Sequence, residues 1–260
     1  MKRIKVLPGI MATSFVLFNC FYVAGQNITI KNDLNDLNLK GKVSSLVETS
    51  YYAKEKDGEI KKVSCLNETS YSFNEKGNEI IVKTYGSDLN LIYKTLFKYD
   101  DKGNKILNNS FNSGDTLLGK AFYKYDDKGN ITEMSSYDTK GRSEGKWSYK
   151  YNEQGYKIEE DYYNSKGSLD EKITDKYDAK GNMIEQDKYK PDGSLKEKGT
   201  FEYDSNGNEI AGKIYNPSYL EDEENYTYKY EYDKTGNWIK KTEFVNYNAD
   251  NITERDIAYY

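Results

Sequence analysis

The sequence predicts an all-β protein: a long antiparallel β-meander of tandem 26-residue, two-strand repeats, forming a single-layer or coiling sheet. First, seven copies of an aromatic–Asp/Asn–x–x–Gly motif form a regular series, and the first six glycines of this series are 26 residues apart. Second, aromatic and polar residues alternate between these glycines, which is the period of a β-strand with two different faces. Third, looser turn sequences lie midway between the glycines, so the chain reverses about every 13 residues.

Residues 1–25 differ from the rest of the chain. Three basic residues among the first five precede an apolar stretch over residues 10–18, and small residues follow it. This order is typical of a secretory signal peptide, and the stretch is too short to span a membrane. We expect cleavage before Gln26 and export to the periplasm, the outer surface or the medium, with no transmembrane segment. Lipid anchoring through Cys20 is disfavoured, because Asn19 is bulkier and more polar than the residue usual before a lipidated cysteine.

The composition of the expected mature chain excludes several chemistries. Loss of three basic residues leaves 35 Lys and Arg against 43 Asp and Glu, a net charge of −8. This acidity argues against nucleic acid as a partner. The chain has no His, which excludes Ser–His and Cys–His catalysis and His-ligated metals. We expect no cofactor and no metal.

After a short N-terminal segment, residues 26–40, we expect one β-hairpin repeat domain over residues 41–260. Residues 43–52, with the turn at Asp57-Gly58, predict an opening hairpin. Residues 238–244 and 252–260 predict closing strands. Capping strands are expected at both ends because an open sheet edge exposes unpaired backbone groups.

The motif itself predicts the turns. An Asx side chain can hydrogen-bond the backbone ahead of it, and glycine accepts the positive φ that closes a hairpin loop. Asn follows the motif glycine in six copies, and Tyr156 is the exception. We assign the turn role to the seven motif glycines: Gly77, Gly103, Gly129, Gly155, Gly181, Gly207 and Gly236.

The block from Tyr125 to Asn130, Tyr-Asp-Asp-Lys-Gly-Asn, resembles the YD or RHS repeat, and the block from Tyr163 to Leu169 is similar to MORN-type repeats. The likeness covers roughly residues 70 to 245 and extends to secreted Bacteroidetes proteins of unknown role. It implies β-hairpins that coil into sheets or shells, or form single-layer meanders, and both families are scaffolds. The repeat array is far shorter than that of RHS toxins, and we expect no toxin domain after it.

Exposed aromatic residues in the middle copies are the candidate ligand-binding residues. Tyr and Trp can stack on sugar rings while neighbouring polar groups bind hydroxyls. The alternative interpretation is that the aromatic rows only hold the sheet together. The candidates are Trp147, Tyr149, Tyr162, Tyr163 and Tyr189. No catalytic residue is assigned, because no pair of carboxylates stands out from the repeat.

The predicted function is therefore that of a non-enzymatic, exported binding or structural module at the cell envelope. Glycan is one expected partner, and an envelope protein, engaged by the sheet face or by strand addition, is another. One alternative is an envelope polysaccharide hydrolase, which requires two carboxylates in a cleft that breaks the repeat. Another is an accessory part of an RHS-type toxin system.

Overall fold

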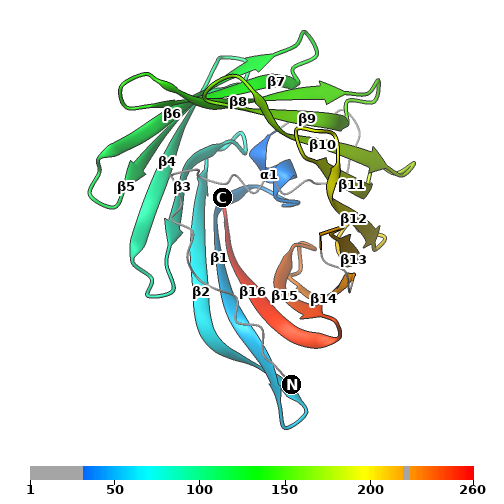
Figure 1. Cartoon of the computed structure of the whole chain (residues 1–260). Helices are drawn as coiled ribbons and strands as arrows, with labels where there is room; N and C mark the ends of the chain where they lie inside the picture. The colour runs from blue at the N-terminus through cyan, green and yellow to red at the C-terminus, as the bar shows by residue number, and fades with distance from the viewer. Residues whose placement is uncertain (1–31, 219–222) are drawn as a thin grey trace.

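The computed structural model describes residues 32–218 and 223–260 of the chain. The predicted signal peptide and Cys20 lie outside these residues. The described elements are one short helix and sixteen strands (Figure 1). They are α1 (Asp33–Asp36), β1 (Val43–Lys56), β2 (Glu59–Phe73), β3 (Glu79–Tyr85), β4 (Leu91–Tyr99), β5 (Lys105–Asn112), β6 (Leu117–Tyr125), β7 (Ile131–Asp138), β8 (Ser143–Tyr151), β9 (Lys157–Asn164), β10 (Leu169–Tyr177), β11 (Met183–Tyr189), β12 (Leu195–Tyr203), β13 (Glu209–Tyr215), β14 (Glu224–Tyr232), β15 (Trp238–Val245) and β16 (Asn248–Tyr259).

The strands form a closed antiparallel barrel. Each strand pairs with the next in sequence, and β1 pairs with β16 from Val43 opposite Tyr259 to Tyr52 opposite Asn251. The all-β prediction is confirmed, but the prediction of an open meander or single-layer coiling sheet was wrong. The terminal strands that we expected to cap open edges pair with each other, so the backbone groups of both edges are satisfied at the seam.

A one-residue bulge recurs where the repeat places its aromatic residues. Tyr99 lies opposite Lys105 while Lys98 lies opposite Leu107, so Ile106 is the extra residue. The same shift occurs beside the equivalent aromatic in most hairpins. Because a bulge bends its strand and increases the local twist, these repeated shifts curve the sheet toward closure.

The motif turns lie together at one end of the barrel, which we call the motif end. Each motif glycine has a φ between 78° and 88°. At a representative turn, the Asp126 Oδ1 accepts hydrogen bonds from the backbone N–H groups of Lys128 and Asn130, at 2.9 and 2.8 Å. The Asn130 side chain then donates to the Asp126 Oδ2 at 2.9 Å. The Asp–Gly–Asn pattern thus closes the turn with side chains as well as backbone.

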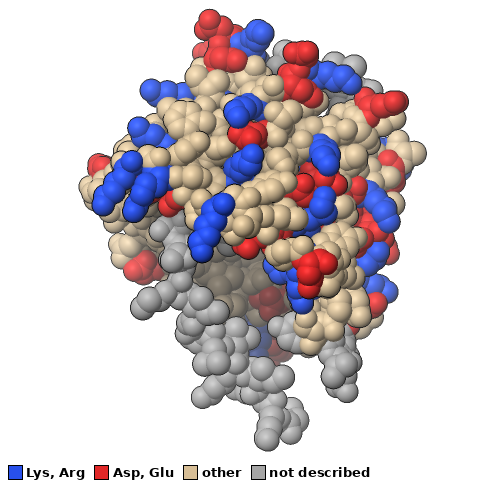
Figure 2. All heavy atoms as spheres, turned by 45° about the horizontal axis from the view of Figure 1, so that its top comes forward, with Lys and Arg blue, Asp and Glu red and all other residues tan. Residues whose placement is uncertain are grey.

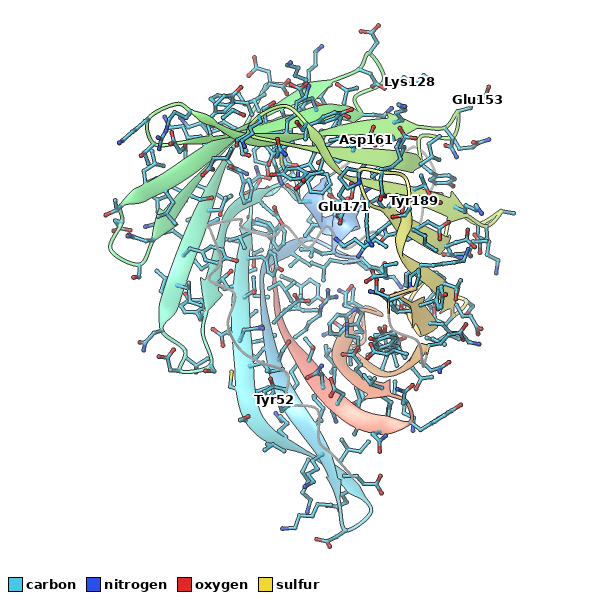
Figure 3. All side chains as sticks on the ribbon, viewed as in Figure 1. Tyr52, Lys128, Glu153, Asp161, Glu171 and Tyr189 are labelled. Carbon is cyan, nitrogen blue, oxygen red and sulfur yellow. The ribbon has the colours of Figure 1, made fainter. Side chains whose placement is uncertain are left out.

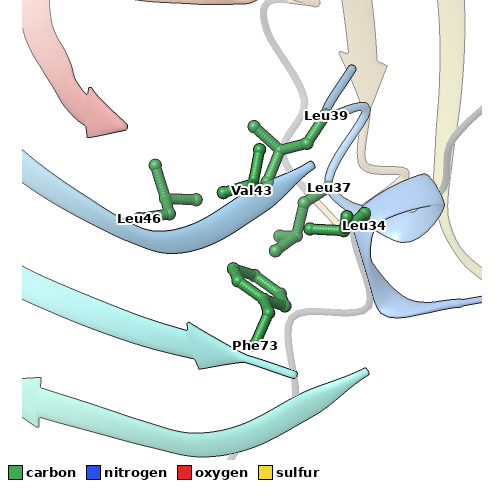
Figure 4. Close-up of a cluster of buried hydrophobic side chains, with 6 residues drawn as sticks. All are labelled: Leu34, Leu37, Leu39, Val43, Leu46 and Phe73. Atoms are coloured by element: carbon green, nitrogen blue, oxygen red, sulfur yellow. The ribbon is translucent and has the colours of Figure 1, made fainter. Parts of the chain in front are cut away.

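The apolar core is confined to the motif end. Residues 32–40, which include α1, lie within the ring of strands (Figure 1). Their leucines pack against the start of β1 and the end of β2 in one cluster (Figure 4). The cluster consists of Leu34, Leu37, Leu39, Val43, Leu46 and Phe73. The other buried hydrophobic residues of the described chain, such as Phe97, Ala121 and Ile173, lie apart from it. The barrel interior is therefore lined mainly by polar and aromatic side chains.

Candidate functional site: the inner wall of the barrel

The pairing register establishes which side chains face inward. The Tyr99 hydroxyl donates to Asp33 of the internal segment at 2.7 Å, so the residues of β4 in phase with Tyr99 face the interior. Directly opposed residues share one face of a sheet. Across β4 to β8, the opposed inward residues are Phe97, Asn108, Ala121, Ser136 and Gly145.

Three of the five predicted binding residues lie on this inner wall. Trp147 is opposite Tyr162, and their rings are 4.8 Å apart at 36°. Tyr149 is two residues beyond Trp147 on the same face. All three side chains are partly exposed. Because they face inward, the solvent that reaches them lies inside the barrel.

The other two predicted residues, Tyr163 and Tyr189, lie on the outer wall. Tyr163 is opposite Lys146, whose Nζ is 5.4 Å from its ring centre. Tyr189 donates its hydroxyl to Asp187 at 3.3 Å. Tyr162 and Tyr163 are adjacent in one strand and must face opposite sides. The sequence identified aromatic positions in β9 but did not establish which of them is internal.

Charged groups accompany the inward aromatic residues on β9 and β10. Lys157 pairs with Glu160 and lies 3.8 Å from the Asp175 Oδ2. The side chains of Lys157 and Asp175 are 2% and 0% exposed. Burial raises the pKa of the Asp175 carboxyl, and Lys157 opposes this shift. Glu171 lies opposite Tyr162 on the same wall, and Figure 3 shows it projecting within the ring.

A second inward cluster, on β13 to β16, was not predicted from the sequence. Burial raises the pKa of Glu209 to about 7, although Lys241 and a hydrogen bond from Tyr228 counteract the shift. Nearby, the Arg255 guanidinium stacks 3.5 Å from the ring centre of Trp238 and pairs with Glu48 at 2.8 Å. The alternating Tyr residues of β14 were a usable signal for this cluster, because their spacing of two places them on one face.

The internal segment, residues 32–40, crosses the motif end. Asp33 contacts Lys105 at 2.9 Å on one side of the ring. Further along the segment, the Asn38 side chain donates to Asn208 at 3.1 Å, and the Lys40 N–H donates to the Asn237 Oδ1 at 2.7 Å. These contacts join β3–β5 to the turns before β13 and β15. The segment therefore spans the motif end from wall to wall.

The outer wall carries ladders of alternating charge. Glu133 lies between Lys124 and Lys146, at 2.7 and 3.2 Å. The same arrangement recurs at 26-residue spacing with Glu159 and Glu185 as the central acids. Figure 2 shows Lys and Arg intermixed with Asp and Glu over this face, and Figure 3 shows Lys128 and Glu153 on turns at the outer rim.

Two further features bear on function. Within residues 32–218 and 223–260, no group of three or more His, Cys, Asp or Glu side chains is arranged to hold a metal ion. No helix in the same residues has both the length and the apolar character needed to cross a membrane.

Comparison with known proteins supports the fold. No protein-family model and no curated protein matches the chain. The structure is similar to a porin-like protein from Bacteroides uniformis, with a TM-score of 0.58 and 15% identity over 84% of this chain and 98% of that chain. At this identity the likeness concerns the fold alone.

Two other solved structures align less well. A porin-like protein from Bacteroides vulgatus has a TM-score of 0.41 and 13% identity over 84% of this chain and 98% of that chain. A Tc holotoxin pore from Photorhabdus luminescens has a TM-score of 0.29 and 15% identity over 79% of this chain and 13% of that chain. These scores carry no structural argument, so the likeness to YD/RHS and MORN repeats rests on the sequence motifs.

Proposed function

We propose that the protein is a non-enzymatic, exported barrel of the cell envelope that binds a saccharide on its inner wall. The observation that carries the proposal is the placement of Trp147, Tyr149 and Tyr162 together inside the barrel, beside the ion pair of Lys157 and Glu160. Aromatic faces stack on sugar rings, and polar side chains accept and donate to the hydroxyls.

The segment that crosses the motif end favours a binding role over conduction. A barrel of sixteen strands is wide enough to enclose a polar interior. Here the interior is crossed by residues 32–40, which are held at both walls by Asp33 and Lys40. The barrel then acts as a cup with access from the opposite end.

The charged outer wall favours an aqueous surrounding for the barrel. A barrel that spans a bilayer presents an apolar band to lipid. The outward Lys124, Lys150 and Lys176 are 71%, 68% and 67% exposed and pair with acids on neighbouring strands. Export follows from the predicted signal peptide, and the fold likeness to a Bacteroides porin-like protein supports an envelope location.

The neighbouring residues Tyr162 and Tyr163 provide the test, because one faces inward and the other outward. We expect residues 26–260 to bind at least one oligosaccharide on a glycan array. In calorimetry, Tyr162→Ala should lower the affinity at least about tenfold, since a lost aromatic contact of ~1.4 kcal/mol changes the equilibrium constant by that factor. Tyr163→Ala should bind as the wild type does. Equal effects of the two substitutions, or no binding to any glycan, would refute the proposal.

One observation favours the alternative of an envelope polysaccharide hydrolase. Burial gives Glu209 a pKa of about 7, and the negative charge of Glu243 contributes to that shift. A protonated acid beside an ionised carboxylate is the pair that glycosidases use. If this alternative holds, the wild type releases reducing ends from a bound polysaccharide and Glu209→Gln does not. Binding without release of reducing ends would support the non-enzymatic proposal.

A further inference from the structure

The motif turn of the fourth copy differs from those of the neighbouring copies at two coupled positions. In the other middle copies, the residue after the motif glycine is an Asn that donates to the second oxygen of the turn Asp, at 2.9 Å for Asn130 and 2.8 Å for Asn182. In the fourth copy these positions hold Asn152 and Tyr156. The backbone N–H of Tyr156 still donates to the Asn152 Oδ1, at 2.9 Å. The backbone turn is therefore preserved, but the hydrogen bond between its two side chains is lost.

The Tyr156 ring packs against the next repeat instead of the turn. It stacks on Tyr177, with ring centres 5.0 Å apart and planes at 19°. Beside the pair, a groove of about 580 Å³ runs between this turn and the one that follows β10. Its volume falls in the range of small-molecule sites, ~300–1,000 Å³. Its polar lining includes Asn152, Gln154 and Asp175.

Asp175, which lines this groove, has one carboxylate oxygen without a hydrogen-bond partner in the described residues. The residue is 4% exposed. Its Oδ1 accepts a hydrogen bond from Gln186 at 3.0 Å, whereas its Oδ2 has no hydrogen-bond partner in the described part of the chain. The Lys157 Nζ is 3.8 Å from that oxygen, beyond hydrogen-bond range. A buried carboxylate oxygen without a donor is unfavourable, so a ligand hydroxyl that reached it would gain a charge-assisted hydrogen bond.

The lining chemistry fits a neutral sugar better than a cation. Asp175 and Asp178 line the groove together with Lys176, and the Lys157 Nζ is 3.8 Å from Asp175, so these four groups carry no excess of negative charge. Two amide side chains, a carboxylate oxygen and an aromatic ring together match a pyranose, which has apolar C–H faces and a rim of hydroxyl donors. We infer that this groove is a saccharide subsite, in which Tyr156 and Tyr177 support one pyranose ring and the Asp175 Oδ2 accepts its hydroxyl hydrogen. The inference rests on the proposed function for its ligand class, but not for its position.

A variant that copies the turn residues of the neighbouring repeats provides the main test of the groove. Asn152→Asp with Tyr156→Asn recreates the Asp–Asn pair of the turns in the neighbouring copies, so we expect the double variant to fold with the melting temperature of the wild type. It removes the aromatic platform of the groove. Asp175→Asn is the second variant, which keeps the shape of the side chain and removes its charge. The probes are neutral gluco-, manno- and galacto-hexasaccharides, titrated by calorimetry.

We expect the double variant and Asp175→Asn each to weaken binding at least tenfold, and an oligogalacturonate to bind more weakly than its neutral counterpart.

Wild-type affinity in the double variant, with binding lost in Tyr162→Ala, would overturn the groove inference and leave the proposed function standing. Loss in the double variant with wild-type affinity in Tyr162→Ala would place the sugar in the groove and not against Trp147 and Tyr162. If the wild type binds none of the three hexasaccharides, the groove inference fails. The proposed function fails with it only if the glycan array is also negative.

Discussion

At the scale of single residues, each motif turn depends on one side chain and on one backbone conformation. The Asp126 carboxylate organises the turn through three hydrogen bonds, and Gly129 takes the φ of 78° that lets the chain reverse. An L side chain is rarely stable at such a φ. Gly114, in the turn between β5 and β6, is different, because there Asp115 has the positive φ of 61°.

This contrast gives a matched pair of glycine substitutions. Gly129→Ala should lower the free energy of unfolding by about 1 kcal/mol, even though no atom lies within 4 Å of the added methyl group, because the backbone conformation is strained. Gly114→Ala should be nearly neutral or slightly stabilising, since its closest new contact is 3.6 Å, to the Asn112 Oδ1. Urea titrations of both variants measure the difference. Equal losses at both sites would contradict the argument from φ.

Glu209 makes the stability depend on pH. Its pKa is about 7 in the folded protein against an ordinary value of 4.5. Between these values the folded state binds more protons than the unfolded state, so the free energy of unfolding falls as pH rises from 4.5 to 7. Each pKa unit corresponds to 1.36 kcal/mol, which sets an upper limit of ~3 kcal/mol for this group. The stabilising contribution is complete below pH 4.5 and is lost above pH 7.

Glu209→Gln tests this dependence. Relative to the wild type, the variant should gain stability on going from pH 4.5 to pH 8, because it never buries an ionised carboxylate. Chemical denaturation at several pH values supplies the curves. Glu202→Gln, at an exposed position on the adjacent strand β12, is the control and should run parallel to the wild type. If the curve of Glu209→Gln also runs parallel to that of the wild type, the Glu209 carboxyl is not the source of the pH dependence.

At the scale of elements, the internal segment is tied to the wall by a buried ionic group. Lys105 contacts Asp33 at 2.9 Å and Glu79 at 3.1 Å, and all three side chains are at most 15% exposed. Burial alone would lower the pKa of Lys105, but the charges of Glu79 and Asp33 raise it well above its usual value. Asp33 also accepts hydrogen bonds from the Glu79 N–H at 2.8 Å and the Tyr99 hydroxyl at 2.7 Å.

Removing the Asp33 side chain should therefore lower the free energy of unfolding substantially. We expect Asp33→Ala to lower the free energy of unfolding by about 3 kcal/mol, because it removes one of the two carboxylates that contact the buried Lys105 and leaves two donors without an acceptor. Lys150→Ala breaks an ion pair of 2.6 Å on the outer wall, where Lys150 is 68% exposed, and should cost less than ~1 kcal/mol. Thermal or denaturant melts compare the two. Similar small losses would mean that the segment does not contribute to barrel stability.

The sequence predicted the hairpins well because they are local. The Asx and glycine positions specify each turn, and the alternation of β8 and β9 specifies their strands. It could not predict the internal position of residues 32–40, because Leu34 and Asp33 acquire partners only in tertiary contacts with Phe73 and Lys105. It also could not orient the candidate site. A bulge reverses the phase of alternation, and Ile106 and its equivalents gave no local sign that they are extra residues.

At the scale of the whole molecule, the two aromatic rows of the repeat lie on opposite walls. The row that contains Tyr99 and Tyr125 faces the interior, where the hydroxyls bond to Asp33 and to the Lys105 carbonyl. The row that contains Tyr137 and Tyr163 faces outward. Both rows sit opposite bulges, so one recurrent sequence feature provides the contacts of both walls and the curvature. The bend of one hairpin is small, and only the sum over sixteen strands joins β1 to β16.

Closure of the barrel predicts slow exchange of the backbone amide hydrogens at the seam, where β1 pairs with β16. The Glu48–Arg255 ion pair at 2.8 Å and the contact between the Ser50 and Thr253 hydroxyls at 3.1 Å join β1 and β16 across it. In the intact protein the amides of both strands should exchange as slowly as those of β5 and β6, since every strand has two neighbours. In an open sheet, alternate amides of β1 and β16 would be unpaired and would exchange quickly.

Truncation after Tyr247, which removes β16, is the matching perturbation. It should abolish the protection of β1 and leave β1 and β15 as free edges, which favours association by edge pairing. Mass-spectrometric exchange and light scattering on residues 26–260 and 26–247 measure both effects. Because the deleted strand pairs with β1 and β15 and not with β5 or β6, β5 and β6 should lose less protection than β1. Fast exchange of β1 in the intact protein, unchanged by the truncation, would mean that the sheet is open in solution.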